Sequence, residues 1–392
     1  MSRKLEASLK KVDNVFQKMY RNKITLKSRD KGSWSETTLD TYRDEVYSIL
    51  RKVYSEYGVS DVTKIKGYMI ESIFYEKINS VHKQRYSAYS LKKSISALVA
   101  LNHGIEQTNV FKRKFSLGDP SKFRDIVKEQ NIKRISKTSQ TLRATPEECK
   151  SVLSELKTIG HQTINREMTL TVAEVMYRTG GRINSVLRLK KKNISIDDNK
   201  LTFWKDKGGL SRTIEISDET KEYLKNITEG KKDEERLFVS KKRDGTFKSM
   251  RQTAKEIEKL IRNAAKHLDR SELVRVKNNE GNYKEILVNR KFTPHSFRKS
   301  FALTRAGEYY ERFSTKQSID NYVRAKIAEN NKIKEKLDSL RFRINKNRNR
   351  KRDLNREEYA IFFTSIDLGH FRNDVILSYY TSFKEVQEYL KK

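Results

Sequence analysis

The sequence predicts a mainly α protein with one small antiparallel sheet (α+β), built from a helical N-terminal domain and a larger C-terminal domain. Three prolines in 392 residues leave long segments free to form uninterrupted helices. Apolar residues recur at helical spacing along most of the chain, whereas strand-like segments are confined to a short stretch around Gly208. The length exceeds what one hydrophobic core usually organises, so two domains are expected.

Changes in composition divide the chain into four parts. Residues 1–30 are polar and basic and are expected to form an arm or one short helix. Residues 31–116 are predicted to be the helical domain, and residues 117–144 a polar, basic linker that opens with the turn signal LGDP. Residues 145–392 are predicted to be the larger domain, with a basic helical insertion at about 308–360.

Three amphipathic helices are expected in the helical domain. The clearest covers residues 35–58, where Ser35 is placed to cap the first turn and Gly58 to end the last. Its apolar side chains recur at steps of three and four: Leu39, Tyr42, Val46, Ile49, Leu50, Val53 and Tyr57. Weaker helical patterns cover residues 64–78 and 89–102, which predicts a small bundle.

The larger domain begins at a clear helix signal. Thr145 is placed at the cap, Pro146 at the first helical position, and Glu148 where it closes a capping box. The helices expected in this domain cover residues 146–157, 166–177 and 249–268.

Between these helices, two strand-like segments at residues 201–207 and 211–217 flank a pair of glycines, which is typical of a β-hairpin. Residues 319–344 keep a broken helical period, which predicts one long helix or a helical hairpin. It ends in the run 341–352, which carries basic side chains and no acidic one.

The charge of the chain points to a polyanionic partner. Lys and Arg number 85 against 51 Asp and Glu, a formal net charge of +34. Such a field attracts and steers a polyanion, and duplex DNA is the natural candidate, because neutralising phosphates releases counterions. Phosphate contacts are expected from basic side chains of the 341–352 run and from two lysines off the apolar stripe of the 89–102 helix: Arg341, Arg343, Arg348, Arg350, Lys92 and Lys93.

Cysteine usage and the chain's start predict a cytoplasmic protein. Cys149 is the one cysteine, so neither an intrachain disulfide nor a zinc site of the cysteine type can form. The start of the sequence lacks the apolar core of a signal peptide, and no stretch has the apolar length of a membrane span. A membrane partner is therefore not expected.

Four separated segments carry the residue types that metal-free phosphoryl transfer needs. They place Arg182 in YRTGGRINSV, Lys207 in WKDKGG, His295 and Arg298 in FTPHSFRKS, and His370 and Tyr379 in DLGHFRNDVILSYY. A tyrosine hydroxyl can act as nucleophile, and the planar forks of the arginines match non-bridging phosphate oxygens. A single segment is a weak or at most a moderate signal, but all four in this order are a strong one.

In this order the set resembles the catalytic residues of the tyrosine recombinases, the phage integrase family. The resemblance covers roughly residues 145–390 and, weakly, the helical domain before them. It implies a core-binding domain and a catalytic domain that close on duplex DNA, with neither cofactor nor metal. It also implies a tetramer on paired DNA sites, in which the C-terminal segment TSFKEVQEYLKK is exchanged between protomers.

The resemblance also implies a role for each residue. Tyr379, nine positions after His370 (379 − 370 = 9), attacks the phosphorus and forms a 3′-phosphotyrosyl bond. Lys207 protonates the departing 5′ oxygen, and the arginines stabilise the charge of the transition state. His295 and His370 assist proton transfer or donate hydrogen bonds to the phosphate. Tyr380 is the rival of Tyr379, and Lys205 is the rival of Lys207.

Three features depart from the family pattern. The family often has an acidic residue three positions after the first Arg, where this chain has Ser185. The residue after Arg298 is often His in the family, and here it is Lys299. Arg298 and His370 are 72 positions apart (370 − 298 = 72), which is further than a typical member needs.

Two functions are therefore predicted as alternatives. The first is a site-specific recombinase or integrase of a phage or other mobile element, acting in the cytoplasm on the nucleoid. The second is a DNA-binding regulator on the same scaffold that no longer cleaves. A hairpin telomere resolvase or a type IB topoisomerase would share the chemistry of the first.

Overall fold

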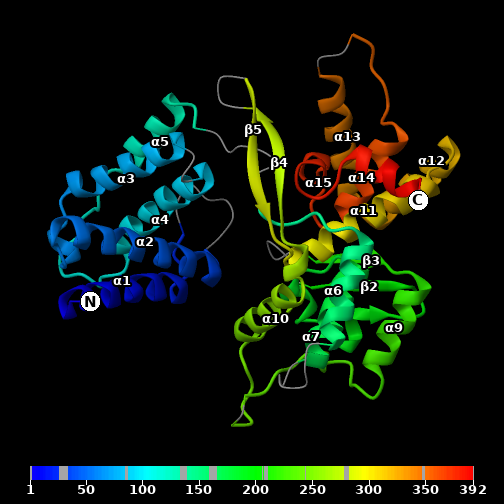
Figure 1. Cartoon of the computed structure of the whole chain (residues 1–392), viewed down its shortest axis with the longest axis horizontal. Helices are drawn as coiled ribbons and strands as arrows, with labels where there is room; N and C mark the ends of the chain where they lie inside the picture. Colours follow the sequence, from blue (N-terminus) through cyan, green and yellow to red (C-terminus); the bar gives the residue numbers. More distant parts are fainter. Residues whose placement is uncertain are drawn as a thin grey trace. The chain divides into compact units, whose positions relative to one another are not determined.

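The structure, a computed structural model, describes residues 2–25, 34–83, 87–132, 139–158, 166–204, 206, 211–242, 244–277, 282–346 and 349–391. It divides the chain into two compact units (Figure 1). Unit 1 comprises residues 1–135 with 277–284, and unit 2 comprises residues 136–276 with 285–392. No helix in the described part of the chain combines the length and apolar character needed to cross a bilayer.

Unit 1 is a helical bundle. Its elements are α1 (Arg3–Arg21), α2 (Glu36–Tyr57), η1 (Val62–Lys64), α3 (Gly67–His82), α4 (Ala88–Gln107) and α5 (Pro120–Glu129). The three predicted helices are confirmed as α2, α3 and α4. As expected for α2, the Ser35 side chain accepts a hydrogen bond from the backbone N–H of Thr38, and Gly58 ends the helix at φ 67°.

Unit 1 extends beyond the predicted helical domain at both ends. The predicted arm contains α1, whose buried side chains join the core: Leu5, Leu9, Val12, Val15, Phe16 and Met19. Gly104 of α4 lets α1 approach, because a Cβ there would lie 2.5 Å from the Sδ of Met19. The predicted linker contains α5, where Phe123 stacks on Phe74 with ring centroids 4.3 Å apart. Packing against the other helices of the bundle thus stabilises helices in segments whose local sequence signals are weak.

One carboxylate, that of Glu45, links α2 to α3 and α4. It accepts hydrogen bonds from Lys77 at 2.9 Å and Ser94 at 2.5 Å, and it pairs with Lys93 at 2.8 Å. Burial alone would raise the pKa of Glu45, but bonds from Lys93, Ser94 and Lys77 outweigh it and lower this pKa to about 2. Its stabilising contribution is therefore present above pH ~4.5 and is lost as the pH falls towards 2.

Replacing Glu45 with Gln is expected to lower the free energy of unfolding of unit 1 by ~2 kcal/mol at pH 7, because two partly buried lysines lose their counter-charge. The difference between variant and wild type should shrink as the pH falls from 4.5 to 2.5. Intrinsic fluorescence during urea unfolding measures it, because Trp34 of unit 1 is 5% exposed and Trp204 of unit 2 is 58% exposed. A pH-independent difference would contradict the assignment.

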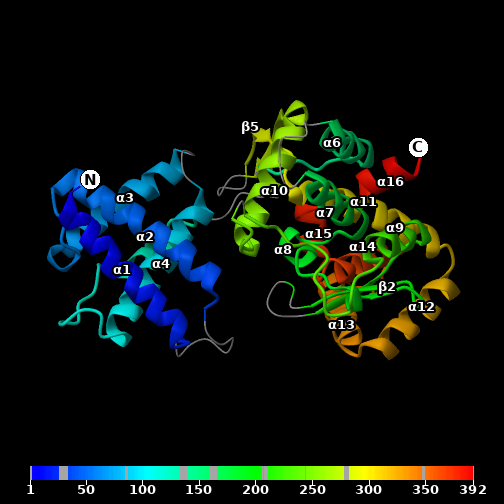
Figure 2. The same cartoon turned by 90° about the horizontal axis from the view of Figure 1, so that it is seen from below.

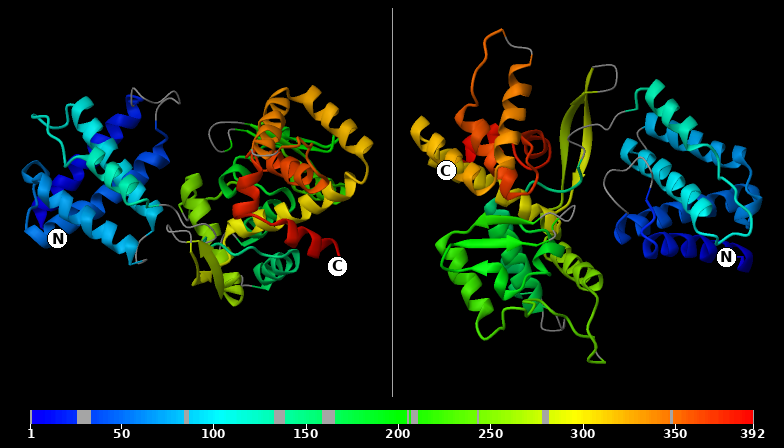
Figure 3. Two further views of the ribbon diagram at one scale, coloured as in Figure 1. Left: turned by 90° about the horizontal axis from the view of Figure 1, so that it is seen from above. Right: turned by 180° about the vertical axis from the view of Figure 1, so that it is seen from behind.

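Unit 2 is mainly helical with two small antiparallel sheets (Figures 2 and 3). Its elements are α6 (Pro146–Thr158), α7 (Arg166–Thr179), α8 (Ile183–Val186), η2 (Lys191–Asn193), β1 (Ile194–Ser195), β2 (Lys200–Phe203), β3 (Arg212–Glu215), α9 (Asp218–Thr228), α10 (Met250–Ala264), η4 (Lys266–Leu268), β4 (Arg270–Lys277), β5 (Tyr283–Arg290), α11 (Pro294–Arg312), α12 (Lys316–Glu329), α13 (Lys332–Asn345), α14 (Arg356–Asp367), α15 (Asn373–Tyr379) and α16 (Phe383–Leu390). Helix α11 lies at its centre and packs against α6, α7, α14 and α16.

Two predicted features of unit 2 are confirmed. The backbone N–H of Thr145 donates to Glu148 at 2.9 Å, and the backbone N–H of Glu148 donates to the Thr145 hydroxyl at 3.2 Å, which completes the capping box of α6. The predicted hairpin is β2–β3, paired antiparallel with Leu201 opposite Ile214, and β1 adds a third strand. Leu201 and Ile214 both face the main core.

The insertion consists of two helices, α12 and α13. Together with α11 and α14 it encloses an aromatic core of Tyr309, Phe313, Tyr322, Tyr359 and Phe363. Glu215 at the end of β3 pairs with Lys326 of α12 at 2.7 Å and with Arg312 at 3.1 Å. Arg343 of α13 lies 3.6 Å from Asp374, which places the insertion against α15.

The C-terminal helix α16 packs on its own chain. Val386 is buried, and Phe383 and Leu390 are partly buried in the same apolar cluster as Phe301 of α11. Gly307 of α11 permits this contact, because a Cβ there would lie 3.0 Å from the ring of Tyr389.

Candidate active site

Helix α11 presents His295 and Arg298 one turn apart at its N-terminal end. Pro294 occupies the first turn, and the backbone N–H of Thr293 donates to the Ser296 hydroxyl at 3.1 Å. This start directs His295 and Arg298 to the same face of the helix. The spacing H-x-x-R therefore brings both side chains to one place.

Arg298 is fully buried and held by three acceptors. Its Nη1 donates to the carbonyl of Gly180, its Nη2 to the carbonyl of Leu368, and its Nε lies 3.3 Å from the hydroxyl of Tyr380. A guanidinium with partners on three separate segments has one orientation. Burial lowers the pKa of Arg298, although an arginine so placed remains a cation at neutral pH.

The hydroxyl of Tyr380 is shared by Arg298 and His370. The Nε2 of His370 lies 3.0 Å from it, and the rings of His295 and His370 lie 5.3 and 5.4 Å from the Tyr380 ring. His370 follows Gly369, which adopts φ 68° where α14 ends. That turn directs His370 back over α11, so residues far apart in sequence share one site.

Arg182 joins the same site from the start of α8. Two glycines precede it: Gly180 adopts φ 59°, and a Cβ there would meet the ring of Phe301 at 2.4 Å. The chain can therefore pass close to α11 and return. The charge of Arg182 contributes to lowering the pKa of both His295 and Arg298, so these groups are electrostatic neighbours. We call Arg182, His295, Arg298 and His370 the arginine–histidine cluster.

Two charged residues of the site were not singled out from the sequence. Asp206, between β2 and β3, bonds to Arg182 at 2.6 Å and to Arg212 of β3 at 2.9 Å. Arg212 also donates to the carbonyls of Asp367 and Gly180, and burial lowers its pKa to about 9. Asp206 lies within the same WKDKGG segment as Lys207, which was the available signal.

The two neighbouring tyrosines differ in environment. Tyr380 is 4% exposed and holds Arg298 and His370, whereas Tyr379 is the last residue of α15 and is partly buried. The contacts at the arginine–histidine cluster thus involve the hydroxyl of Tyr380. Lys207 and its rival Lys205 lie outside the described residues.

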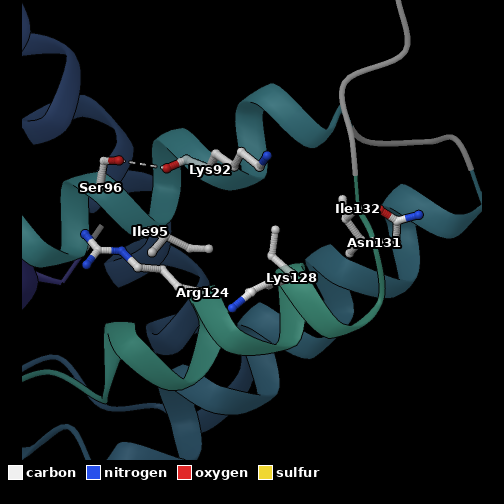
Figure 4. A pocket seen from close by; sticks show the side chains of 8 residues that line it. Lys92, Ile95, Ser96, Arg124, Lys128, Asn131 and Ile132 are labelled. Atoms are coloured by element: carbon white, nitrogen blue, oxygen red, sulfur yellow. Dashed lines mark hydrogen bonds between the residues drawn. The ribbon is translucent and has the colours of Figure 1, made fainter. Parts of the chain in front are cut away.

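The residues expected to contact phosphate lie in three environments. Lys92 is exposed and lines a pocket of about 490 Å³ between α4 and α5, together with Arg124 and Lys128 (Figure 4). Three others form ion pairs within the chain: Lys93 with Glu45 at 2.8 Å, Arg341 with Asp353 at 2.9 Å, and Arg343 with Asp374 at 3.6 Å. Arg350 is exposed. Arg348 lies outside the described residues. Internal ion pairs therefore engage part of the 341–352 run.

Two bases of α11, the half-buried His295 and the buried Lys299, bind protons weakly. Burial and the charges of Arg298, Lys299, Arg182 and His370 lower the pKa of His295 to about 3, so His295 is neutral at pH 7. Burial, with the nearby charges of Arg143 and Arg290, lowers the pKa of Lys299 to about 7. Lys299 donates to the carbonyl of Thr141 at 2.7 Å and so ties the segment before α6 to α11.

A pH-dependent stability follows from Lys299. Its pKa is lower in the folded chain than the ordinary ~10.4, so the unfolded chain holds more protons between pH 7 and 10.4, and the free energy of unfolding rises with pH in that window. Relative to Lys299→Met, the wild type is expected to gain ~2 kcal/mol between pH 7 and 9 in denaturant titrations of unit 2 followed by circular dichroism. Parallel pH curves for the two proteins would argue against this.

Residues 142–307 match the model of the Phage integrase family. This part of the chain is a phage integrase domain. It contains Arg182, His295 and Arg298, and the matched segment ends within α11, before the α12–α13 insertion and before His370. The arginine–histidine cluster thus joins three residues of the matched segment to a fourth beyond the insertion.

Three solved structures are similar to the chain that carries the phage integrase domain. The XerH site-specific recombinase bound to difH substrate is 15% identical over 100% of this chain and 98% of that one, with a TM-score of 0.47. The Tn1549 transposon integrase in complex with transposon right end DNA is 13% identical over 97% and 98%, with a TM-score of 0.45. A lambda integrase dimer bound to a COC' core site is 15% identical over 79% and 92%, with a TM-score of 0.45. No curated protein sequence matches the chain.

Proposed function

We propose that the chain is a site-specific DNA recombinase of a phage or other mobile element, which cleaves and rejoins duplex DNA through a 3′-phosphotyrosyl intermediate. The observation that carries the proposal is the meeting of Arg298 and His370 on one hydroxyl oxygen, from positions 72 residues apart (370 − 298 = 72). Their donors converge there as they would on a non-bridging phosphate oxygen. The phage integrase domain supports the assignment.

In the proposed reaction, a tyrosine oxygen attacks the phosphorus and the bond from phosphorus to the 5′ oxygen breaks. The tyrosine proton passes to a neighbouring base, for which His295 and His370 are the candidates, and Lys207 gives a proton to the 5′ oxygen. Arg182 and Arg298 stabilise the charge on the non-bridging oxygens. The new phosphotyrosyl bond retains the energy for rejoining, so no nucleotide cofactor is required.

We propose Tyr379 as the nucleophile, on its nine-residue spacing from His370. It is partly buried at the end of α15, whereas Tyr380 is 4% exposed and its ring lies against both histidines. In this reading the Tyr380 hydroxyl occupies the position that a phosphate oxygen takes when DNA binds. The alternative nucleophile is Tyr380 itself, which its hydrogen bonds to Arg298 and His370 favour.

DNA contact is proposed for both units. In unit 1 the exposed Lys92, Arg124 and Lys128 surround one pocket, which suits a phosphate backbone better than an uncharged ligand (Figure 4). In unit 2 Arg350 is exposed and remains a candidate. Each phosphate-contacting cation should reduce the slope of affinity against salt concentration by about one when it is removed.

A tetramer is proposed for the synapsed state on DNA. The proposed exchange requires α16 to leave its own chain, where Arg143 pairs with Glu385 at 3.2 Å and donates to the carbonyl of Ser378 at 3.1 Å. These contacts join α16 to the end of α15, so release of α16 and movement of the tyrosine-bearing segment are mechanically linked. Mass photometry on paired sites measures the state, and a monomer on such sites would count against the proposal.

The decisive experiment is a suicide-substrate assay. Nicked duplexes cover the DNA that flanks the chain's own coding sequence, because mobile-element recombinases often act near it. A covalent protein–DNA adduct that resists denaturant and forms in EDTA is the expected result. Tight, sequence-specific binding without an adduct would instead support the second candidate, a DNA-binding regulator that no longer cleaves. Product analysis on paired and palindromic duplexes separates recombinase from topoisomerase and telomere resolvase.

A further inference from the structure

Asp206 is a buried carboxylate that joins three groups of the site. Its Oδ2 lies 2.6 Å from Nη1 of Arg182 and 2.9 Å from Nε of Arg212, and its Oδ1 accepts a hydrogen bond from Ser185 at 2.7 Å. The residue is 8% exposed. Both carboxylate oxygens therefore have strong partners, and the side chain has little freedom to move.

Arg212 holds the carboxylate of Asp206 in place. The ring of Phe203 lies 4.2 Å from the Arg212 guanidinium, whose other nitrogens donate to the carbonyls of Asp367 and Gly180. Those carbonyls belong to the ends of α14 and α7, which also position the arginine–histidine cluster. Arg212 thus fixes Asp206 relative to the ends of these two helices, and Asp206 in turn fixes the side chain of Arg182.

Asp206 is ionised in this setting. Burial alone would raise its pKa, but the hydroxyl of Ser185 and the charges of Arg212 and Arg182 outweigh burial and lower it well below the usual range. A negative charge among Arg182, Arg212 and Arg298 also offsets their mutual repulsion, which favours a compact arrangement of the three cations.

We propose that Asp206 is the positioning residue that orients Arg182 towards the scissile phosphodiester. The inference rests on the proposed recombinase function. Arg182 has five N–H donors in a planar fork, and the bond from Nη1 to Asp206 leaves its remaining donors for the phosphate oxygens.

The position of Ser185 offers a way to test the charge separately from the residue. Its Oγ touches Asp206, so a longer acidic side chain at position 185 can bring a carboxylate to the same place from α8. In the double variant Ser185→Glu with Asp206→Ser, the charge beside Arg182 is restored from another element.

The experiment measures single-turnover cleavage of a suicide duplex together with duplex affinity and thermal melting. Asp206→Ser and Asp206→Asn are expected to slow cleavage by on the order of 100-fold, because one transition-state donor is misplaced, with affinity changed less than about threefold. Ser185→Glu with Asp206→Ser should recover about tenfold of the loss. A matched control is Glu215→Ser, which removes a carboxylate paired with two cations at the far end of β3, and it should cleave at a rate close to wild type.

A second substrate distinguishes orientation from loss of structure. A methylphosphonate at the cleaved position replaces one charged non-bridging oxygen with a methyl group, so an arginine aimed at that oxygen matters less. The ratio of wild-type to Asp206→Ser rates should fall by about tenfold or more on this substrate. A merely structural defect would leave the ratio unchanged.

The outcomes are distinct. An adduct that Asp206→Ser and Asp206→Asn form at the wild-type rate overturns this inference alone. The inference is also overturned if adding Ser185→Glu to Asp206→Ser restores the melting temperature but not the cleavage rate. If the wild type forms no adduct on any duplex, the recombinase proposal falls and this one falls with it.

Discussion

Tyr379→Phe is expected to abolish the covalent protein–DNA adduct, whereas Tyr380→Phe is expected to retain it. Phenylalanine lacks the oxygen that forms the phosphotyrosyl bond, so no adduct remains after loss of the nucleophile. Tyr380→Phe removes a hydroxyl that holds Arg298 and His370 in the DNA-free chain. Cleavage by that variant should stay within about tenfold of wild type, since the phosphate itself supplies the acceptor that these donors lose.

The two variants are matched controls for each other, because they differ from wild type by one oxygen at neighbouring positions. Denaturing gels of the nicked-duplex reaction give the readout. The opposite pattern, with the adduct lost in Tyr380→Phe and kept in Tyr379→Phe, would move the nucleophile to Tyr380. Adducts from both variants and from the double variant would exclude a tyrosine nucleophile at this end of α15.

Arg298→Lys is expected to reduce cleavage by about 10³-fold while the protein stays folded. Lysine keeps the charge but loses the planar fork that reaches Gly180, Leu368 and Tyr380 together. Loss of one transition-state donor typically costs 10²–10³ in rate, and disorder of the neighbouring His370 adds to it. Duplex affinity should change much less, since phosphate contacts elsewhere supply most of it.

Arg305→Lys is the control for this experiment. Arg305 is also buried on α11 and pairs with Asp367 at 2.6 Å, two turns beyond Arg298. The variant should show a comparable fall in melting temperature with cleavage within about threefold of wild type. Equal losses of cleavage in both variants would indicate that α11 has simply lost its packing.

The helices with strong local signals could be predicted from the sequence. Residues 35–58 carry a cap, a sustained apolar stripe and a terminal glycine, and α2 forms there with those ends. Helix α1 was not predicted with the domain because its burial depends on packing against α2 and α4, which a local pattern does not show. The hairpin of β4 and β5 was not expected, because its exposed residues Leu273 and Leu287 and its charged neighbours give no clear alternation of apolar and polar positions.

The candidate site could likewise be predicted only in part from the sequence. The type and order of Arg182, His295, Arg298 and His370 could be taken from sequence, and the structure brings these four together. The carboxylate beside Arg182 comes from Asp206 and not from position 185, because Asp206 lies against Ser185 of α8 in the fold, which no local pattern reveals. The sequence could not show that the Tyr380 ring faces the cluster, because neighbouring residues at a helix end differ in direction only in three dimensions.

Cys149 gives the chain a practical advantage for solution measurements. Its thiol is fully buried in α6, and burial raises its pKa to about 12, so maleimide reagents have little thiolate to attack. No other cysteine occurs in the sequence. One cysteine can therefore be introduced at an exposed position of each unit and labelled with a fluorophore, without first removing Cys149. Energy transfer between the two dyes would report any change in the distance between the labelled positions when DNA is added.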